Sequence, residues 1–139
     1  MVTSPNRVGG FTLIELMITV VIAAILGSIA VPSYLTHVRE GRRNEAKRAL
    51  MEAAQSMESY YAMNMTYIGT ASGSTPAVFS DKVPKDGSDR YYTLTLDPAP
   101  TAQGYTIMAT PQGGQSADSC GALSLSRSGA RTPTQSGCW

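Results

Sequence analysis

The chain has 139 residues, enough for one domain, and its 11 basic and 10 acidic residues leave a formal net charge of +1. This balance excludes a protein that holds nucleic acid through its overall charge. The sequence has no Ser/His/Asp or Cys/His arrangement and no phosphate-binding loop, so we expect no catalytic residue, no cofactor and no enzymatic activity.

The first element in the chain is an apolar run from Phe11 to Leu35, in which Glu15 is the only charged residue. A bilayer core needs about 20 apolar residues, so this run is long enough to span a membrane as a helix. A secretory signal would place small residues after its apolar stretch, but here Gly9 and Gly10 precede it. On length alone, a plain uncleaved anchor is the favoured interpretation.

Glu15 argues against a plain anchor, because a charge inside a bilayer costs at least a few kcal/mol and therefore needs a partner. Cleavage after Gly10 would create such a partner, a cationic amine on Phe11. The amine and the carboxylate would be four residues apart, on one face of a helix. They could pair within one chain or between neighbouring chains, and the spacing does not choose between the two.

The segment GFTLIEL, Gly10–Leu16, resembles the type III leader junction of type IV pilins and of their pseudopilin relatives. The resemblance implies that residues 1–10 are a leader, and that a prepilin peptidase cuts between Gly10 and Phe11 and methylates the Phe11 amine. It also implies that Glu15 guides assembly by pairing with the Phe11 amine of an adjacent subunit. Residues 11–38 would then form the transmembrane and filament-core helix.

Two helix-perturbing residues, Gly27 and Pro32, lie within this segment. Proline lacks a backbone donor and disfavours the helical conformation of the preceding residue. In the family this stretch can kink or locally melt within the filament. The alternative is that both residues are simply tolerated, because glycine and proline are common in membrane helices.

Charged residues reappear between Arg39 and Arg48, a segment that contains five basic and two acidic residues. This segment could be a solvated helix face, a lipid-headgroup anchor or a subunit contact, and the alternatives stay open. Beyond Asn44, apolar residues recur at steps of three and four, which predicts an amphipathic helix. The predicted stripe comprises Ala46, Ala49, Leu50, Ala53, Ala54, Met57 and Tyr61.

The C-terminal part alternates turn signals with strand-like stretches. We expect loops from Asn64 to Arg90 and strands at Tyr91–Leu96, Gly104–Thr110 and Gly121–Ser126, with a short edge strand within Thr132–Trp139. The predicted fold is α+β, the type IV pilin fold. In it the C-terminal half of a long N-terminal helix packs on a three- to four-stranded antiparallel sheet, and residues 39–139 form the globular part.

Cys120 and Cys138 permit one intramolecular disulfide, which an exported chain would form in an oxidising compartment. A metal site is the weaker interpretation, since the single histidine, His37, lies far away in the sequence. Asp81, Asp86 and Asp89 could suggest a calcium loop, but interleaved basic residues favour a plain turn. We therefore expect no bound metal.

The tail from Cys120 to Trp139 resembles the C-terminal region of PilE-type pilins and minor pilins, whereas type II secretion pseudopilins commonly lack its paired cysteines. The resemblance implies a PilE-like, minor pilin. It would be a single-pass protein of the bacterial inner membrane as a precursor, and would then join other pilins in a homo- or hetero-polymeric extracellular pilus, or fimbrium, for twitching motility or adhesion.

Two alternatives remain open for the function. The first is a DNA-binding minor pilin for natural transformation, with Arg127 and Arg131 as contacts, because these two are the only charges between Ser119 and Trp139. Against it, two arginines on a loop are ordinarily solvated. The second alternative is a pseudopilin of type II secretion.

Overall fold

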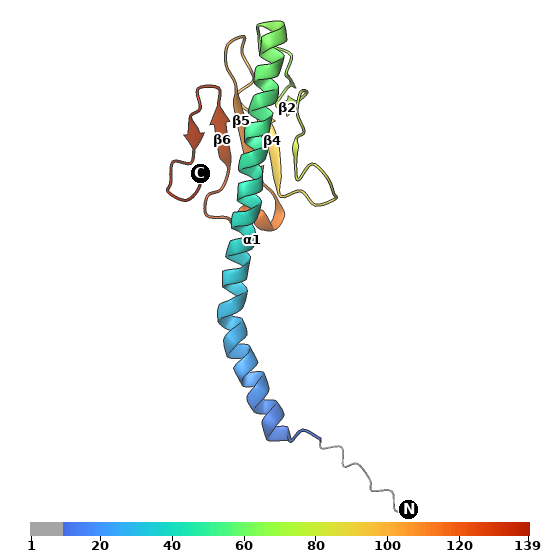
Figure 1. Ribbon diagram of the computed structural model, residues 1–139, viewed down its shortest axis with the longest axis vertical. Helices are drawn as coiled ribbons and strands as arrows, with labels where there is room; N and C mark the ends of the chain where they lie inside the picture. Colours follow the sequence, from blue (N-terminus) through green and yellow to red (C-terminus); the bar gives the residue numbers. More distant parts are fainter. Residues whose placement is uncertain (1–9) are drawn as a thin grey trace, which may run out of the picture. The chain divides into compact units, whose positions relative to one another are not determined.

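The computed structural model describes residues 10–139 and divides the chain into two compact units, which meet between Thr36 and His37. Residues 11–36 are called the stem below, and residues 37–139 the head (Figure 1). Helix α1, Leu13–Asn64, contributes to both units. The predicted leader lies outside the described residues except for Gly10.

Helix α1 begins where the sequence supplies an N-cap. The Thr12 hydroxyl accepts a hydrogen bond from the backbone N–H of Glu15 at 3.3 Å, and the Thr12 carbonyl accepts one from Leu16 at 3.1 Å. Thr12 and Glu15 have the spacing of a capping box, which satisfies backbone donors at a helix start. The residues that resemble a processing signal therefore also define the first turn of the helix.

The stem has no core of its own. Its large apolar side chains are between 44% (Leu35) and 82% (Phe11) exposed. One window of α1 is long and apolar enough to cross a membrane, and none of that window is buried within the structure. Gly27 and Pro32 both lie inside α1, so a local perturbation of the helix at these residues stays a prediction.

The head combines the second half of α1 with an antiparallel sheet that runs as a meander. The sheet has the order β3-β4-β5-β6-β7, with a separate two-stranded hairpin of β1 and β2 and a 3₁₀ turn, η1, between β5 and β6. The bounds are Ala71–Ser72 (β1), Thr75–Pro76 (β2), Lys82–Val83 (β3), Tyr92–Leu96 (β4), Thr106–Pro111 (β5), Gly113–Ala117 (η1), Leu123–Ser126 (β6) and Arg131–Thr132 (β7).

The core of the head lies between α1 and one face of this sheet, which the helix crosses in Figure 1. Alternate residues of β4 and β5 point into the core, as the pleat of a half-buried sheet requires. The predicted helical stripe supplies the other side, with Ala46, Leu50, Ala53 and Met57 no more than 2% exposed. The predicted fold class, a long helix on an antiparallel sheet, is confirmed.

The details of the sheet differ from the prediction in three places. The sheet has five strands instead of three to four. The extra strand β3 and the β1–β2 hairpin lie in the segment predicted as loops, because strands of two residues show no alternation to detect. The predicted edge strand is shorter than expected and ends at Thr132, since Pro133 cannot donate to a ladder.

Candidate functional site

Phe11 lies two residues before the start of α1, and Glu15 lies in its first turn. Both residues are exposed. An acidic side chain there interacts favourably with the positive end of the helix dipole. The Glu15 side chain is exposed, and its pairing with an amine of its own chain or of another chain is not tested by this structure. Cleavage after Gly10, methylation of Phe11 and the pairing of Glu15 stay predictions.

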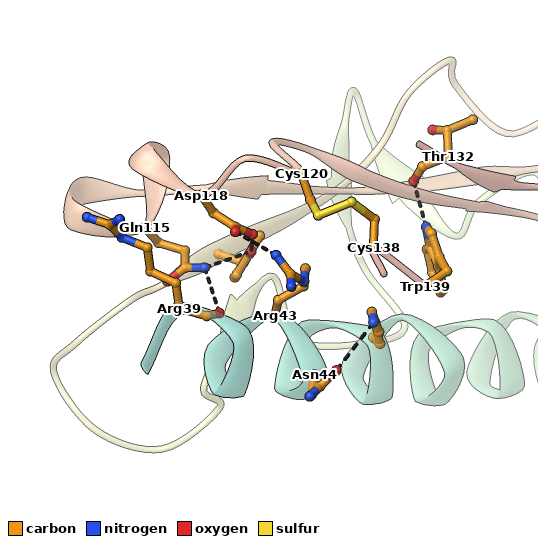
Figure 2. Close-up of a disulfide and its surroundings, with 11 residues drawn as sticks. Arg39, Arg43, Asn44, Gln115, Asp118, Cys120, Thr132, Cys138 and Trp139 are labelled. Atoms are coloured by element: carbon orange, nitrogen blue, oxygen red, sulfur yellow. Dashed lines mark hydrogen bonds and ion pairs between the residues drawn. A yellow bond between two sulfur atoms is a disulfide. The ribbon is translucent and has the colours of Figure 1, made fainter. Parts of the chain in front are cut away.

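A disulfide closes the C-terminal loop of the head. Cys120 and Cys138 are joined with their Cα atoms 5.6 Å apart, and their residues are only 9% and 1% exposed. The following residue, Trp139, is half-buried against the core, and its indole N–H donates to the Thr132 carbonyl at 2.7 Å (Figure 2). The chain end is thus fastened to the edge strand β7 as well as to Cys120.

Arg127 and Arg131 are exposed and rest on aromatic rings. The Arg127 guanidinium lies 5.3 Å and 5.5 Å from the ring centroids of Tyr61 and Tyr67, and it donates to the Gln103 carbonyl at 2.8 Å. Arg131 lies 5.2 Å from the Trp139 ring. Among the described residues, neither arginine has a carboxylate oxygen within 4.0 Å. Each is held by a cation–π contact with most of its donors free.

Beside Arg127 lies an open hollow of about 560 Å³. It is lined by Gln103, Gly104, Tyr105, Ser126, Arg127 and Ser128. Tyr105, which lines the hollow, belongs to a tyrosine cluster in which the hydroxyls of Tyr67 and Tyr105 both donate to Glu58 Oε1, at 2.9 Å and 3.2 Å. Burial, reinforced by the Glu58 carboxylate, raises the pKa of both tyrosines.

A buried polar network that is not among the sequence predictions connects α1 to the segment between β5 and β6 (Figure 2). Arg43 Nη1 donates to Asp118 Oδ1 at 2.6 Å, and both side chains are less than 10% exposed. The Tyr92 hydroxyl donates to Asp118 Oδ2 at 3.4 Å. Gln115 Nε2 donates to the Tyr92 hydroxyl at 3.1 Å and to the Arg39 carbonyl at 3.0 Å.

A signal for this network was available in the sequence. Arg43 precedes Ala46 by three residues and Leu50 by seven, so it continues the apolar stripe of the helix by one further turn. A charge in that position requires a buried partner. Its partner, Asp118, is 75 residues away in the sequence, and no local pattern identifies it.

The first part of α1 is apolar and long enough to cross a membrane, and its second part packs on the sheet of the head. These features define a class of proteins in which one helix joins a membrane-compatible segment to a folded, disulfide-containing head. Two family models match the chain. Residues 32–124 match the model described as "Type IV minor pilin ComP, DNA uptake sequence receptor", and residues 5–31 match the prokaryotic N-terminal methylation motif. The chain belongs to the type IV pilin family, whose members are structural subunits of pili.

Individual relatives agree with this assignment. The chain is 30% identical to a type IV pilin from Shewanella oneidensis of known structure, with a TM-score of 0.55 over 73% of this chain and 97% of that one. It is 29% identical to the type II secretion system core protein G of Pseudomonas aeruginosa over 72% of each chain. It is 38% identical to the type IV major pilin protein PilA of Myxococcus xanthus over 42% of this chain and only 26% of that protein.

Proposed function

We propose that this chain is made as an inner-membrane precursor, is cut between Gly10 and Phe11 by a prepilin peptidase, and assembles with other pilins into an extracellular type IV pilus. The supporting observation is the stem, whose apolar side chains have no partner within the described chain. Their burial must come from lipid before assembly and from neighbouring stems afterwards. The match to the methylation motif over residues 5–31 supports the processing step.

The assembly step depends on Glu15 in this proposal. Packed among apolar stems, the carboxylate needs a cation, and a methylated Phe11 amine of an adjacent subunit would supply one. The capping bond from Glu15 N–H to Thr12 involves the backbone and leaves the carboxylate available. Glu15 therefore selects subunits whose leader has been removed, because only these carry an amine at Phe11.

A substitution of Glu15→Gln tests this step, with Glu40→Gln as the matched control in the head segment of the same helix. We expect Glu15→Gln to preserve membrane insertion and leader cleavage but to reduce the amount of subunit in sheared filaments by about tenfold or more, equivalent to about 1.4 kcal/mol. Filament incorporation at the level of the Glu40→Gln control would contradict the pairing.

DNA capture from the assembled pilus is a second candidate. The family model that covers residues 32–124 carries the description of a DNA uptake sequence receptor, and this description favours the candidate. Arg127 and Arg131, although beyond that match, present donors without a carboxylate partner in the described residues. Phosphate contacts of this kind give affinity that falls with salt.

A DNA-binding assay on the full chain in detergent micelles tests the second candidate. The variant is Arg127→Gln with Arg131→Gln, and the control is Arg90→Gln, whose guanidinium already lies 3.6 Å from Asp81. We expect the double variant to weaken binding at low salt and to reduce the salt slope by about two, one for each phosphate contact. Equal binding by the wild type and the double variant would exclude these arginines as the contacts.

The relatives from type II secretion leave a pseudopilus as the alternative filament. The protein composition of the filaments that contain this chain distinguishes the two, since pilus and pseudopilus have different subunits. The processing and assembly chemistry proposed above is the same in both cases.

A further inference from the structure

The five basic residues of the segment Arg39–Arg48 form three groups in the folded head, the smallest of which is Arg48 alone, exposed further along α1. Arg43 is buried against Asp118 and is neutralised there. Lys47 donates to Asn44 at 3.3 Å, and burial, with the nearby Arg43 charge, lowers the pKa of its ammonium group. Arg43 therefore serves the head itself, and Lys47 is hydrogen-bonded to a neighbour on α1.

Arg39 and Arg42 form the group nearest to the apolar run. They are three residues apart, so they lie on one face of α1. The Arg42 guanidinium is 4.0 Å from the centroid of the Tyr91 ring, which orients it without consuming its N–H donors. Within residues 10–139, neither arginine has a carboxylate oxygen within 4.0 Å, and the nearest acid in the sequence, Glu40, has its Oε2 3.4 Å from His37 Nδ1.

The chain itself limits how far these arginines can lie from the end of the apolar run. Arg39 follows Leu35 by four residues, so even a fully extended chain could separate them by only about 14 Å. Along a helix the separation is about 6 Å for Arg39 and about 10 Å for Arg42. The headgroup layer adds roughly 5 to 8 Å on each side of the hydrocarbon core, and a long arginine side chain can reach back to it.

We propose that Arg39 and Arg42 form a binding site for anionic phospholipid headgroups in the outer leaflet of the inner membrane, occupied before the subunit enters a filament. This inference rests on the membrane stage of the proposed function. The planar guanidinium group of arginine can donate two parallel hydrogen bonds to a phosphate. Two such groups on one face of the helix suit the phosphodiester of an anionic lipid. Continuity with the apolar run favours lipid over DNA as the source of the phosphate.

Spin-labelled lipids test the site on the full chain in phosphatidylcholine bilayers. Electron spin resonance measures the fraction of label that the protein immobilises, for phosphatidylglycerol and for phosphatidylcholine separately. We expect a preference for phosphatidylglycerol, of up to about fivefold for each arginine. Arg39→Gln with Arg42→Gln should bring the ratio towards one. The control, Arg48→Gln with Lys82→Gln, removes the same charge from exposed positions of the head and should keep the preference.

The two spin-labelled lipids distinguish a failure of the Arg39–Arg42 lipid site from a failure of membrane insertion. If neither lipid is immobilised, the chain is not inserted and the membrane stage of the proposed function fails. If phosphatidylcholine is immobilised but phosphatidylglycerol shows no preference, insertion holds and the lipid site is wrong. If both double variants lower the preference equally, overall charge and not the Arg39–Arg42 site attracts the lipid, and the inference is also overturned. Near-ultraviolet circular dichroism of Trp139 confirms that each variant has a folded head.

Discussion

Between Phe11 and Leu35 every large apolar side chain is at least 44% exposed, whereas Ala46, Leu50, Ala53 and Met57 in the same helix are no more than 2% exposed. The stem has no internal packing within the described residues, and the proposed function assigns its burial to lipid or other subunits, while the head is stabilised by internal packing and a disulfide. One helix serves both regions, because its sequence changes from uniformly apolar to amphipathic after Leu35. Mutations in the head and in the stem should consequently have separable effects.

The largest effect should come from Asp118→Ala. Removing this carboxylate leaves Arg43 buried without a counter-charge, which typically costs about 3–5 kcal/mol. Denaturant unfolding of the full chain in micelles, followed through the single tryptophan, Trp139, measures the loss in the head alone. The double variant Arg43→Met with Asp118→Leu should restore most of the stability, because it removes both charges together. A loss as large in the double variant would contradict the ion-pair explanation.

A matched pair of leucines tests the contrast between the regions directly. Leu50→Ala should create a cavity in the head and lower its free energy of unfolding by roughly 2–5 kcal/mol, because Leu50 is fully buried. Leu26→Ala makes the same chemical change in the stem, where Leu26 is 63% exposed, and should leave the Trp139 unfolding transition unchanged. If Leu26→Ala destabilised the head equally, the two regions would not be independent.

Loss of the disulfide should lower the stability of the head somewhat less than the loss of Asp118. Replacing both Cys120 and Cys138 by serine removes a link across 18 residues and should lower the stability of the head by about 3 kcal/mol in the chain-entropy model. Membrane insertion of the stem, measured by protection from protease in vesicles, should not change. An unaltered unfolding midpoint in the serine variant would show that the loop is held by other contacts, such as the Trp139 bond to Thr132.

A smaller effect on the stability of the head should appear at alkaline pH. Burial raises the pKa values of Tyr67, Tyr92 and Tyr105 in the folded head above the unfolded value near 10. Because the unfolded state then releases protons first, the contribution of these tyrosines is complete below about pH 10 and is lost as the pH rises above it. The unfolding midpoint of the head should fall in that range. Tyr105→Phe should weaken the dependence, and the stem variant Tyr34→Phe should not.

The sequence predicts the architecture well where periodicity is strong. The helical stripe from Ala46 to Met57 and the alternating strands β4, β5 and β6 are long enough for apolar spacing to identify them. Strands of two residues, such as β3, fall below that length. Their pairing is determined by neighbouring strands and not by their own sequence.

The buried network was missed for a different reason. Charged residues in a basic segment are ordinarily solvated, and nothing within Arg39–Arg48 separates Arg43 from its neighbours except its place on the apolar stripe. Its partners Asp118, Gln115 and Tyr92 come from distant parts of the chain, so only the three-dimensional fold brings them together. The aromatic partners of Arg127 and Arg131 were not predictable for the same reason.

The central claim is that the stem becomes buried in a filament after the leader is removed. Intact mass and N-terminal sequence of this chain, recovered from sheared surface filaments, test it most directly. We predict a chain that begins at Phe11, carries a methyl group on its amine and contains the Cys120–Cys138 disulfide. A chain that begins at Met1, or one that stays in the membrane and is absent from the filaments, would contradict the account.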